Sequence, residues 1–253
     1  TDLALQVTKR HELLDKIIDL SAIEELRVIS EDAHSIRIGA GACLSDVMVK
    51  VQTQFPALYD MLSVFGSQQI RNLATLGGNL GTASPIGDTL PVLMAYNARV
   101  VLESIGKKRE VLMDDFMTGY RQTARKPDEL ITGIIIPKMT NGAIVKSYKV
   151  SKRKDLDIST VSAGFRLELT GGNRIESIKL AYGGMAEQTK RATRTEQFFS
   201  GKNWIRETVE EAMLQLGKEF TPISDARSGA EFRTVAARNL LLKFWSETAK
   251  NHV

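Results

Sequence analysis

A glycine-rich stretch, residues 66–88, most constrains how this chain folds. It contains five glycines, four amide side chains and four hydroxyl side chains. Glycine adopts positive φ and has no Cβ to block close approach of the main chain, and successive amides in such turns form anion-binding nests. We interpret the stretch as a loop that binds phosphate or pyrophosphate, with Asn79 and the Thr and Ser hydroxyls as further donors. Asp88 is placed to cap a helix over residues 89–95.

The glycine spacing does not match the standard nucleotide fingerprints. The stretch contains neither G-x-G-x-x-G nor a P-loop ending in Gly-Lys-Ser/Thr. From composition alone, a structural turn and a phosphate cradle therefore both stay open.

The overall composition is that of a globular protein. Hydrophobic residues make up 43% and charged residues 25% of the 253 residues, a length typical of one or two domains. No apolar run approaches the ~20 residues of a membrane span, and the first residues do not resemble a signal peptide. The one cysteine, Cys43, excludes an internal disulfide and a cysteine-ligated iron–sulfur cluster within this chain. We expect a cytoplasmic location without membrane contact.

The charge pattern argues against nucleic-acid binding. The net charge is +4, but the 34 basic residues are interspersed with 30 acidic ones. The densest basic run, residues 152–154, is followed by Asp155 and Asp157, so we interpret it as a solvated loop. Aromatic residues are only 6% of the chain, and no basic stripe alternates with stacking side chains.

The apolar pattern predicts an α+β protein. In the first part we expect a strand at 13–20, a helix at 21–26 with a capping box from Ser21 and Glu24, and a hairpin of 27–30 with 35–41. Helices are expected at 44–55, 57–65 and 89–95, and strands at 99–104, 109–113 and 127–137. Residues 138–142 are the expected boundary. Beyond it we expect strands at 143–151, 157–169 and 174–182, and helices at 189–199, 204–216 and 230–248.

The order of residues in the glycine-rich stretch carries a resemblance. Residues 69–80 and 82–88 resemble the second FAD-contacting segment of the xanthine dehydrogenase flavoprotein family, which related molybdenum hydroxylases such as carbon monoxide dehydrogenase share. Residues 119–121, Gly-Tyr-Arg, and 182–186, Tyr-Gly-Gly-Met-Ala, are similar to further motifs of that family. The resemblance implies a vanillyl-alcohol-oxidase/PCMH-type FAD-binding domain at 1–141, truncated of its first strands and first flavin loop. A C-terminal α+β domain of the CO dehydrogenase flavoprotein type follows at 142–253.

The resemblance also implies site residues. Phe65 matches the aromatic that lies against the isoalloxazine ring. The cofactor-binding positions that it implies are Thr1, Asp2, Leu3, Phe65, Gly66, Thr75, Gly77, Gly78, Asn79, Thr82, Ala83, Ser84, Asp88, Ile131 and Lys149. The positions implied on the nicotinamide side are Tyr120, Asp88, Asp155 and Leu156. Leu156 stands where an acidic residue is common in the family.

Several of these residues also have an ordinary structural interpretation. Taken singly, Phe65 is typical of a core residue, Tyr120 of a surface tyrosine, and Lys149 of a strand lysine that extends to solvent. Trp204 and Trp245 occupy apolar helical positions and are expected in the core. The three histidines show no metal-ligand spacing, so no metal site is predicted. No nucleophilic triad is visible either, and hydride transfer between flavin and nicotinamide needs none.

The resemblance implies the function of an FAD-binding component, the small subunit of a bacterial xanthine dehydrogenase. Electrons from a molybdenum cofactor would pass through 2Fe-2S clusters to FAD and leave as hydride to NAD⁺, while hypoxanthine or xanthine is oxidised to urate. The other centres would lie on a molybdopterin-binding large subunit and a 2Fe-2S domain, in a heterotetramer or larger assembly. The alternatives are the flavin subunit of an aldehyde-, CO- or nicotinate-oxidising relative, and a non-catalytic nucleotide-binding regulatory module.

Overall fold

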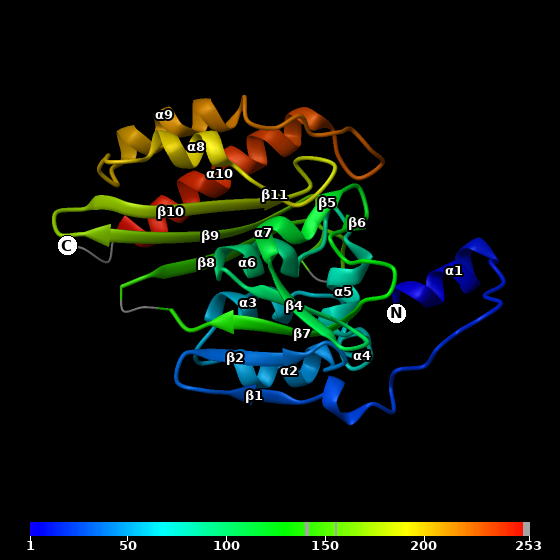
Figure 1. Cartoon of the computed structure of the whole chain (residues 1–253). Helices are drawn as coiled ribbons and strands as arrows, with labels where there is room; N and C mark the ends of the chain where they lie inside the picture. The colour runs from blue at the N-terminus through cyan, green and yellow to red at the C-terminus, as the bar shows by residue number, and fades with distance from the viewer. Residues whose placement is uncertain (140–141, 155, 250–253) are drawn as a thin grey trace.

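The computed structural model describes residues 1–139, 142–154 and 156–249, and two antiparallel sheets dominate it (Figure 1). The first sheet has the strand order β1-β2-β7-β3-β4 and the second the order β11-β10-β9-β8. The strands of the first sheet are β1 (Ile29–Glu31), β2 (Ser35–Gly39), β3 (Arg99–Ser104), β4 (Lys107–Leu112) and β7 (Leu130–Pro137). The remaining strands are β5 (Met117–Gly119), β6 (Gln122–Thr123), β8 (Ile144–Val150), β9 (Val161–Thr170), β10 (Arg174–Gly183) and β11 (Lys190–Arg191). The predicted α+β class is confirmed.

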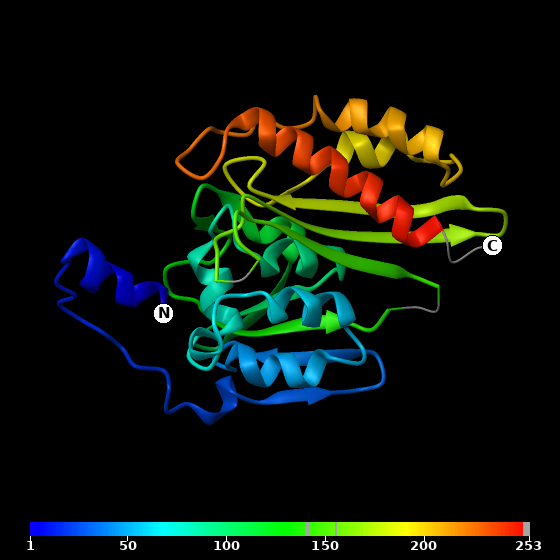
Figure 2. The same ribbon diagram turned by 180° about the vertical axis from the view of Figure 1, so that it is seen from behind.

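The helices lie between the sheets and on the outer face of the second sheet (Figures 1 and 2). The first group comprises α2 (Leu44–Val51), α3 (Pro56–Ser63), α4 (Gln68–Arg71), α5 (Leu76–Thr82), α6 (Thr89–Ala95) and α7 (Met113–Phe116). The outer group comprises α8 (Thr193–Phe198), α9 (Arg206–Leu216) and α10 (Ala230–Thr248). Helices α3 and α6 contact β8 and β9 from one side, and α10 contacts the same strands from the other. The second sheet is therefore covered on both faces.

Each sheet belongs to its own hydrophobic core. In the first, Ile38 of β2 lies opposite Ile134 of β7, and both are buried with the inner faces of α2, α3 and α6. In the second, an aromatic cluster forms around Phe165 of β9, whose ring lies 5.0 Å from that of Tyr182 and 5.4 Å from that of Phe244. Trp204 is fully buried in this cluster, as predicted.

The N-terminal thirty residues differ from the prediction. Helix α1 (Asp2–Arg10) begins the chain, and residues 13–20 pair with no described strand. Apolar side chains in this segment, Ile17 and Ile18 among them, are exposed, and it stands away from the body in both views (Figures 1 and 2). A strand needs hydrogen bonds from a neighbouring strand, and no strand of the described chain pairs with this segment.

The capping box predicted at Ser21 is also wrong. The ordered turn is a 3-10 helix, Glu24–Leu26, with Ile23 before it and no side-chain cap. The Ser21 main chain and hydroxyl instead donate to the Asp19 carboxylate at 2.8 and 2.9 Å. This contact lowers the pKa of Asp19, with the backbone bond as the largest cause.

The glycine-rich stretch contains two short helices, α4 and α5, rather than forming a continuous loop. Ser67 accepts from the Ile70 N–H at the start of α4, and Thr75 accepts from the Gly78 N–H at the start of α5. Leu76 and Leu80 give α5 a fully buried apolar face. N-terminal caps together with apolar spacing therefore outweigh the weak helix propensity of glycine.

Smaller differences concern element limits. The segment 189–199 begins with the two-residue strand β11, and its helix starts only at Thr193. Strand β9 starts at Val161 rather than at residue 157. The predicted boundary at 138–142 falls between β7 and β8, and residues 140 and 141 lie outside the described chain. No helix among the described residues is both long and apolar enough to span a membrane.

Candidate flavin site

Helix α5 presents a glycine face to solvent. Gly78 and Gly81, one turn apart, are both exposed. A Cβ at Gly81 would meet only Ile131 Cδ1 at 3.5 Å, so the main chain on this side of the helix is accessible. Gly77 serves another purpose, because a Cβ there would lie 2.6 Å from Ala40. Gly77 therefore allows α5 to pack against the end of β2, whereas Gly78 and Gly81 leave room for a ligand.

Hydroxyl and amide groups around α5 connect it to its neighbours. Thr89 Oγ1 donates to Asn79 Oδ1 at 2.6 Å, which joins α5 to the start of α6. Thr82 Oγ1 lies 3.0 Å from the Gly78 carbonyl and 3.3 Å from Asp2 Oδ2. The beginning of α1 therefore lies beside the end of α5 (Figure 1), and the predicted positions 1–3 and 75–82 lie in one region.

The turn between α5 and α6 is tied to the second sheet. Ala83 has φ 47° and is buried, and Ser84 accepts from the Gly87 N–H through its carbonyl at 2.9 Å. The Pro85 carbonyl accepts from the Gly184 N–H at 2.8 Å. The motif around Gly184 thus contacts the glycine-rich stretch directly.

A buried ion pair lies at the end of this turn. Lys149 Nζ lies 2.8 Å from Asp88 Oδ2, and their side chains are 6% and 9% exposed. Lys149 also donates to the Val64 carbonyl at 3.1 Å, and the Ser159 hydroxyl donates to Asp88 Oδ1 at 2.5 Å. Lys149 and Ser159 therefore both bind the Asp88 carboxylate, and Val64 joins the cluster through Lys149.

Two single-residue expectations are corrected here. Asp88 does not cap α6, because its side chain makes no cap hydrogen bond and turns to Lys149 and Ser159 instead. Lys149 does not extend to solvent, because its ammonium group donates hydrogen bonds to a buried carboxylate and to a carbonyl. Among the described residues, Ser159 and Val64 join the site without having been predicted. The only sequence signal for Ser159 is a hydroxyl run, residues 159–160, just before an apolar strand.

Phe65 lies at the edge of the first core. Its side chain is half-buried against the cluster, so part of it is accessible. Arg71 Nη1 donates to the carbonyls of Phe65 and Gly66 at 2.9 and 3.2 Å, which fixes the turn in which Gly66 takes φ 52°. Ile131 of β7 is also half-buried, beside α5.

Two of the residues predicted on the nicotinamide side, Tyr120 and Leu156, lie on exposed loops, whereas Asp88 is buried. Tyr120, at the tip of the β5–β6 hairpin, is 62% exposed, and Leu156 is 58% exposed with φ 56°. Within the described residues no hydrogen bond connects either of them to Asp88. Asp155 lies outside the described residues. Asp157 accepts from the Arg153 N–H, the largest cause of its lowered pKa.

An open groove of about 460 Å³ adjoins Lys149 between α3, the end of β8 and α10. Val64 and Asp60 line one side, and Arg153 and Lys243 line the other. The accessible main chain of α5 and the half-buried Phe65 suit a ligand with phosphates and a flat ring, although neither lines this groove. The donor set offers no metal site, since no group of His, Cys, Asp or Glu in the described chain has metal-ligand geometry.

Family models cover nearly the whole chain. Residues 1–139 match the FAD binding domain in molybdopterin dehydrogenase, and residues 146–248 match the CO dehydrogenase flavoprotein C-terminal domain. The chain belongs to the FAD-binding molybdopterin dehydrogenase family. The resemblance read from residues 69–88 is thereby confirmed.

Individual relatives agree with this family. A xanthine dehydrogenase/oxidase from Gallus gallus is 33% identical in an alignment of 259 positions that covers 97% of this chain but 19% of that protein. A glyceraldehyde dehydrogenase medium chain from Sulfolobus acidocaldarius is 30% identical, over 93% of this chain and 83% of that one. The carbon monoxide dehydrogenase structure from Hydrogenophaga pseudoflava superimposes with a TM-score of 0.89 at 25% identity, over 96% of this chain and 84% of that chain. This chain thus spans about a fifth of the length of the xanthine dehydrogenase that it matches.

Proposed function

We propose that this chain is the FAD-binding component of a xanthine dehydrogenase that uses NAD⁺ as acceptor. The observation that carries the proposal is the Asp88–Lys149–Ser159 cluster, which joins the glycine-rich segment to the second sheet beside Phe65 and an open groove. The similarity to the Gallus gallus enzyme supports the substrate class. The same proposal places the chain in the cytoplasm and in an assembly with a molybdopterin-binding subunit and a 2Fe-2S domain.

The residues present fit FAD, which when bound supplies redox chemistry that accepts single electrons and gives a hydride to a nicotinamide. In the proposal, Gly78, Gly81 and Thr82 admit the pyrophosphate to the main chain of α5. Phe65 and Lys149, whose charge Asp88 balances, would help to hold the ring. Tyr120 and the loop of Asp155 and Leu156 border the nicotinamide side.

The chain itself performs no acid–base step in this proposal. Its residues would bind and orient the flavin and the nicotinamide and would exclude water from between them. They would contribute to the reaction by holding these two rings in contact. We also propose that the chain divides into an FAD-binding domain at 1–141 and a C-terminal domain at 142–253, with the cofactor bound at the first.

A second candidate keeps the flavin and changes the substrate. The Sulfolobus acidocaldarius relative named as a glyceraldehyde dehydrogenase medium chain is covered over 83% of its length, so this chain corresponds to nearly a complete subunit of that protein. This match favours an aldehyde-oxidising relative as the alternative.

The test is an anaerobic spectral titration of the purified native complex. We expect a flavin absorption band that bleaches on addition of NADH and also on addition of xanthine. A band that bleaches with NADH and glyceraldehyde, but not with xanthine, contradicts the substrate and favours the alternative. A band unaffected by NADH removes NAD⁺ as acceptor, and a complex without flavin contradicts the whole proposal.

A further inference from the structure

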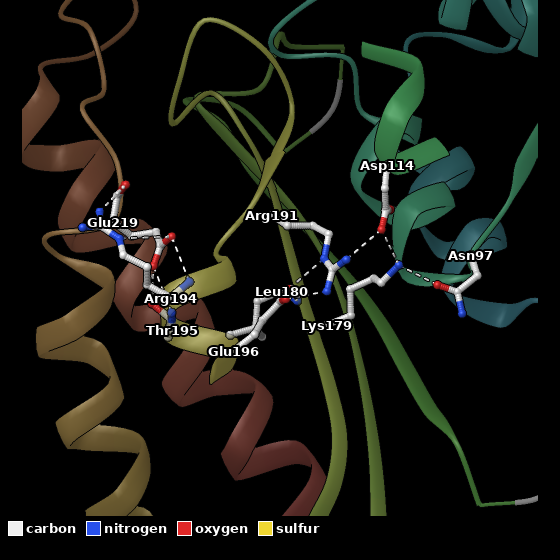
Figure 3. Close-up of polar contacts among 9 residues, drawn as sticks. All are labelled: Asn97, Asp114, Lys179, Leu180, Arg191, Arg194, Thr195, Glu196 and Glu219. Atoms are coloured by element: carbon white, nitrogen blue, oxygen red, sulfur yellow. Dashed lines mark hydrogen bonds and ion pairs between the residues drawn. The ribbon is translucent and has the colours of Figure 1, made fainter. Parts of the chain in front are cut away.

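A second polar cluster, separate from the candidate flavin site, joins α7 to the second sheet (Figure 3). Asp114 Oδ2 of α7 lies 2.8 Å from Lys179 Nζ of β10 and 2.8 Å from Arg191 Nη1 of β11. Arg191 also pairs with Glu196 of α8, with Nη2 2.5 Å from Oε2 and Nε 3.1 Å from Oε1. Lys179 donates further to Asn97 Oδ1 at 2.5 Å, in the turn after α6. The cluster thus connects the second sheet and α8 to α7 and to the turn after α6.

The charges in this cluster are balanced and shielded from water. Asp114 and Lys179 are 21% and 13% exposed, and Glu196 is 8% exposed. Burial lowers the pKa of Lys179, and its bond to Asp114 opposes that effect. Two carboxylates therefore meet two cations in a site where a missing partner would leave a charge poorly solvated. One carboxylate oxygen, Asp114 Oδ2, receives both cations, while Oδ1 is buried and makes no hydrogen bond in the described chain.

The second-sheet side of the cluster is held firmly. Glu196 Oε1 accepts from the Leu180 N–H at 2.7 Å, which fixes α8 to β10. Glu219, in the segment after α9, accepts from the Thr195 N–H and hydroxyl at 2.9 and 3.0 Å, and Figure 3 shows it beyond α8. Arg191 therefore presents its guanidinium to Asp114 from a rigid support.

The other side of the cluster leads directly to Tyr120. Helix α7 ends at Phe116, and β5 of the β5–β6 hairpin begins at Met117. The Phe116 carbonyl accepts from the Ala124 N–H at 2.8 Å, which closes the hairpin onto α7. The hairpin is thereby joined to the helix that carries Asp114. In both overall views this hairpin lies at the same end of the molecule as α5 (Figures 1 and 2).

We propose that Asp114 is a positioning residue, which by binding Lys179 and Arg191 sets the place of the β5–β6 hairpin, and with it Tyr120, beside the flavin site. The part of this inference that concerns NAD⁺ rests on the proposed function. The part that concerns the hairpin rests on the contacts alone.

The experiment compares Asp114→Asn with Asp225→Asn in the native complex. Asp225 is a matched control, because it is also a partly buried carboxylate paired with an arginine. Its Oδ1 lies 2.9 Å from Arg233 Nη2 and its side chain is 28% exposed, and Asp225 and Arg233 both belong to the C-terminal part of the chain. Hydrogen exchange of residues 117–124 is measured together with kcat and KM for NAD⁺ and the flavin content. For Asp114→Asn we expect roughly tenfold faster exchange at 117–124 and a raised KM for NAD⁺, with flavin content unchanged. Asp225→Asn leaves both quantities as in the wild type.

Unchanged exchange at 117–124 in a folded Asp114→Asn protein overturns the inference. Equal effects of the two substitutions on exchange and KM also overturn it, because the cluster is then only a general structural link. If Asp114→Asn does not fold, Arg191→Lys replaces it in the experiment. This variant keeps the charge but loses the paired contact with Glu196, so we expect an intermediate change in exchange at 117–124 and in KM. If the wild-type complex does not react with NADH, the proposed function fails, and the exchange comparison still decides the role of Asp114.

Discussion

At the residue scale, one lysine shows how a side chain acquires its role from distant parts of the chain. Lys149 binds Asp88, 61 positions earlier, and the carbonyl of Val64, 85 positions earlier. Its β-strand position alone predicts an exposed amine. The amine is buried because two other segments supply a carboxylate and a carbonyl for it.

Replacing Lys149 by Met tests this pair. We expect the free energy of unfolding to fall by about 3–5 kcal/mol, because the Asp88 carboxylate stays buried with only the Ser159 hydroxyl as partner. The double variant Asp88→Asn with Lys149→Met loses less, since no buried charge remains. Thermal unfolding of the assembled protein measures both. As a control, Glu210→Gln breaks the exposed Arg206–Glu210 pair and costs about 0.3–0.5 kcal/mol. A Lys149→Met loss no larger than the control contradicts the expectation.

At the element scale, α5 is a short helix that combines three glycines with a buried leucine face. Gly77 packs against Ala40, while Gly78 and Gly81 face solvent. Glycine weakens a helix by about 0.5–1 kcal/mol relative to alanine, so glycine at exposed helical positions needs a reason outside helix stability. Close approach of a cofactor to the main chain is that reason in the proposed function.

Gly81→Ala separates the effect of this glycine on helix stability from its effect on cofactor binding. The added Cβ makes one ordinary contact, with Ile131 at 3.5 Å, so we expect the FAD-free protein to gain about 0.5–1 kcal/mol. We expect FAD to bind roughly tenfold more weakly, because the methyl group occupies the cofactor's side of α5. Fluorescence titration with FAD measures the affinity. Gly217→Ala, a similar change at the end of α9 with contacts of 3.5 Å or more, raises stability slightly and leaves FAD affinity unchanged. Equal FAD affinity in both variants would place the cofactor elsewhere.

A second element-scale contact predicts a pH dependence. Glu129, just before β7, accepts from Arg109 Nε and Nη2 at 2.7 and 2.8 Å and from the Lys126 N–H at 2.7 Å. These bonds, that from Arg109 first, lower the pKa of Glu129 from 4.5 to about 2. A lowered pKa means that the ionised carboxylate stabilises the folded chain above about pH 4.5, and that this stabilisation is lost as the pH falls toward 2.

Glu129→Gln therefore lowers stability at neutral pH and flattens the fall in stability between about pH 4.5 and 2. Unfolding midpoints measured across this pH range check the expectation. Arg109→Lys, which keeps one charge but not the paired contact, is expected to lie between the wild type and Glu129→Gln. A Glu129→Gln protein with the same pH slope as the wild type assigns the acid sensitivity to other carboxylates.

At the scale of the whole molecule, the two hydrophobic cores meet where α6 packs on the second sheet. Ala181 of β10 belongs to the core of the first sheet. A Cβ at Gly164 of β9 would lie 2.3 Å from the main chain of Pro91 in α6. The absence of a side chain at Gly164 therefore brings the helix onto the strand, and with it the turn that ends at Asp88.

Gly164→Ala tests the packing of α6 on β9. We expect a loss of about 1–3 kcal/mol in the free energy of unfolding, because either α6 or β9 must shift to accommodate the methyl group. Displacement of α6 also disturbs Asp88, so flavin content falls with stability. The control is Gly171→Ala in the β9–β10 turn, where a Cβ meets nothing within 4 Å and stability changes by less than about 0.5 kcal/mol. A neutral Gly164→Ala contradicts close packing of α6 on β9.

Local sequence was sufficient for most elements and for the family. Apolar runs and turn residues predicted most strands of both sheets, and helices were also predicted at the positions of α6 and α10. It failed at residues 13–20, because a strand depends on a hydrogen-bonding neighbour. It also failed inside residues 66–88, because Ser67 and Thr75 cap helices that glycine content alone disfavours.

The order of residues by itself determined the α+β class and the membership in a flavoprotein family, since both depend on short-range patterns and a contiguous motif. Only the tertiary structure decided which charges are paired. Asp88 with Lys149, and Asp114 with Lys179 and Arg191, are separated by 61 to 77 positions, and they meet because α6, which contacts α7, packs against the second sheet. Burial then makes each pairing necessary, because an ionised group removed from water requires an opposite charge or several hydrogen bonds.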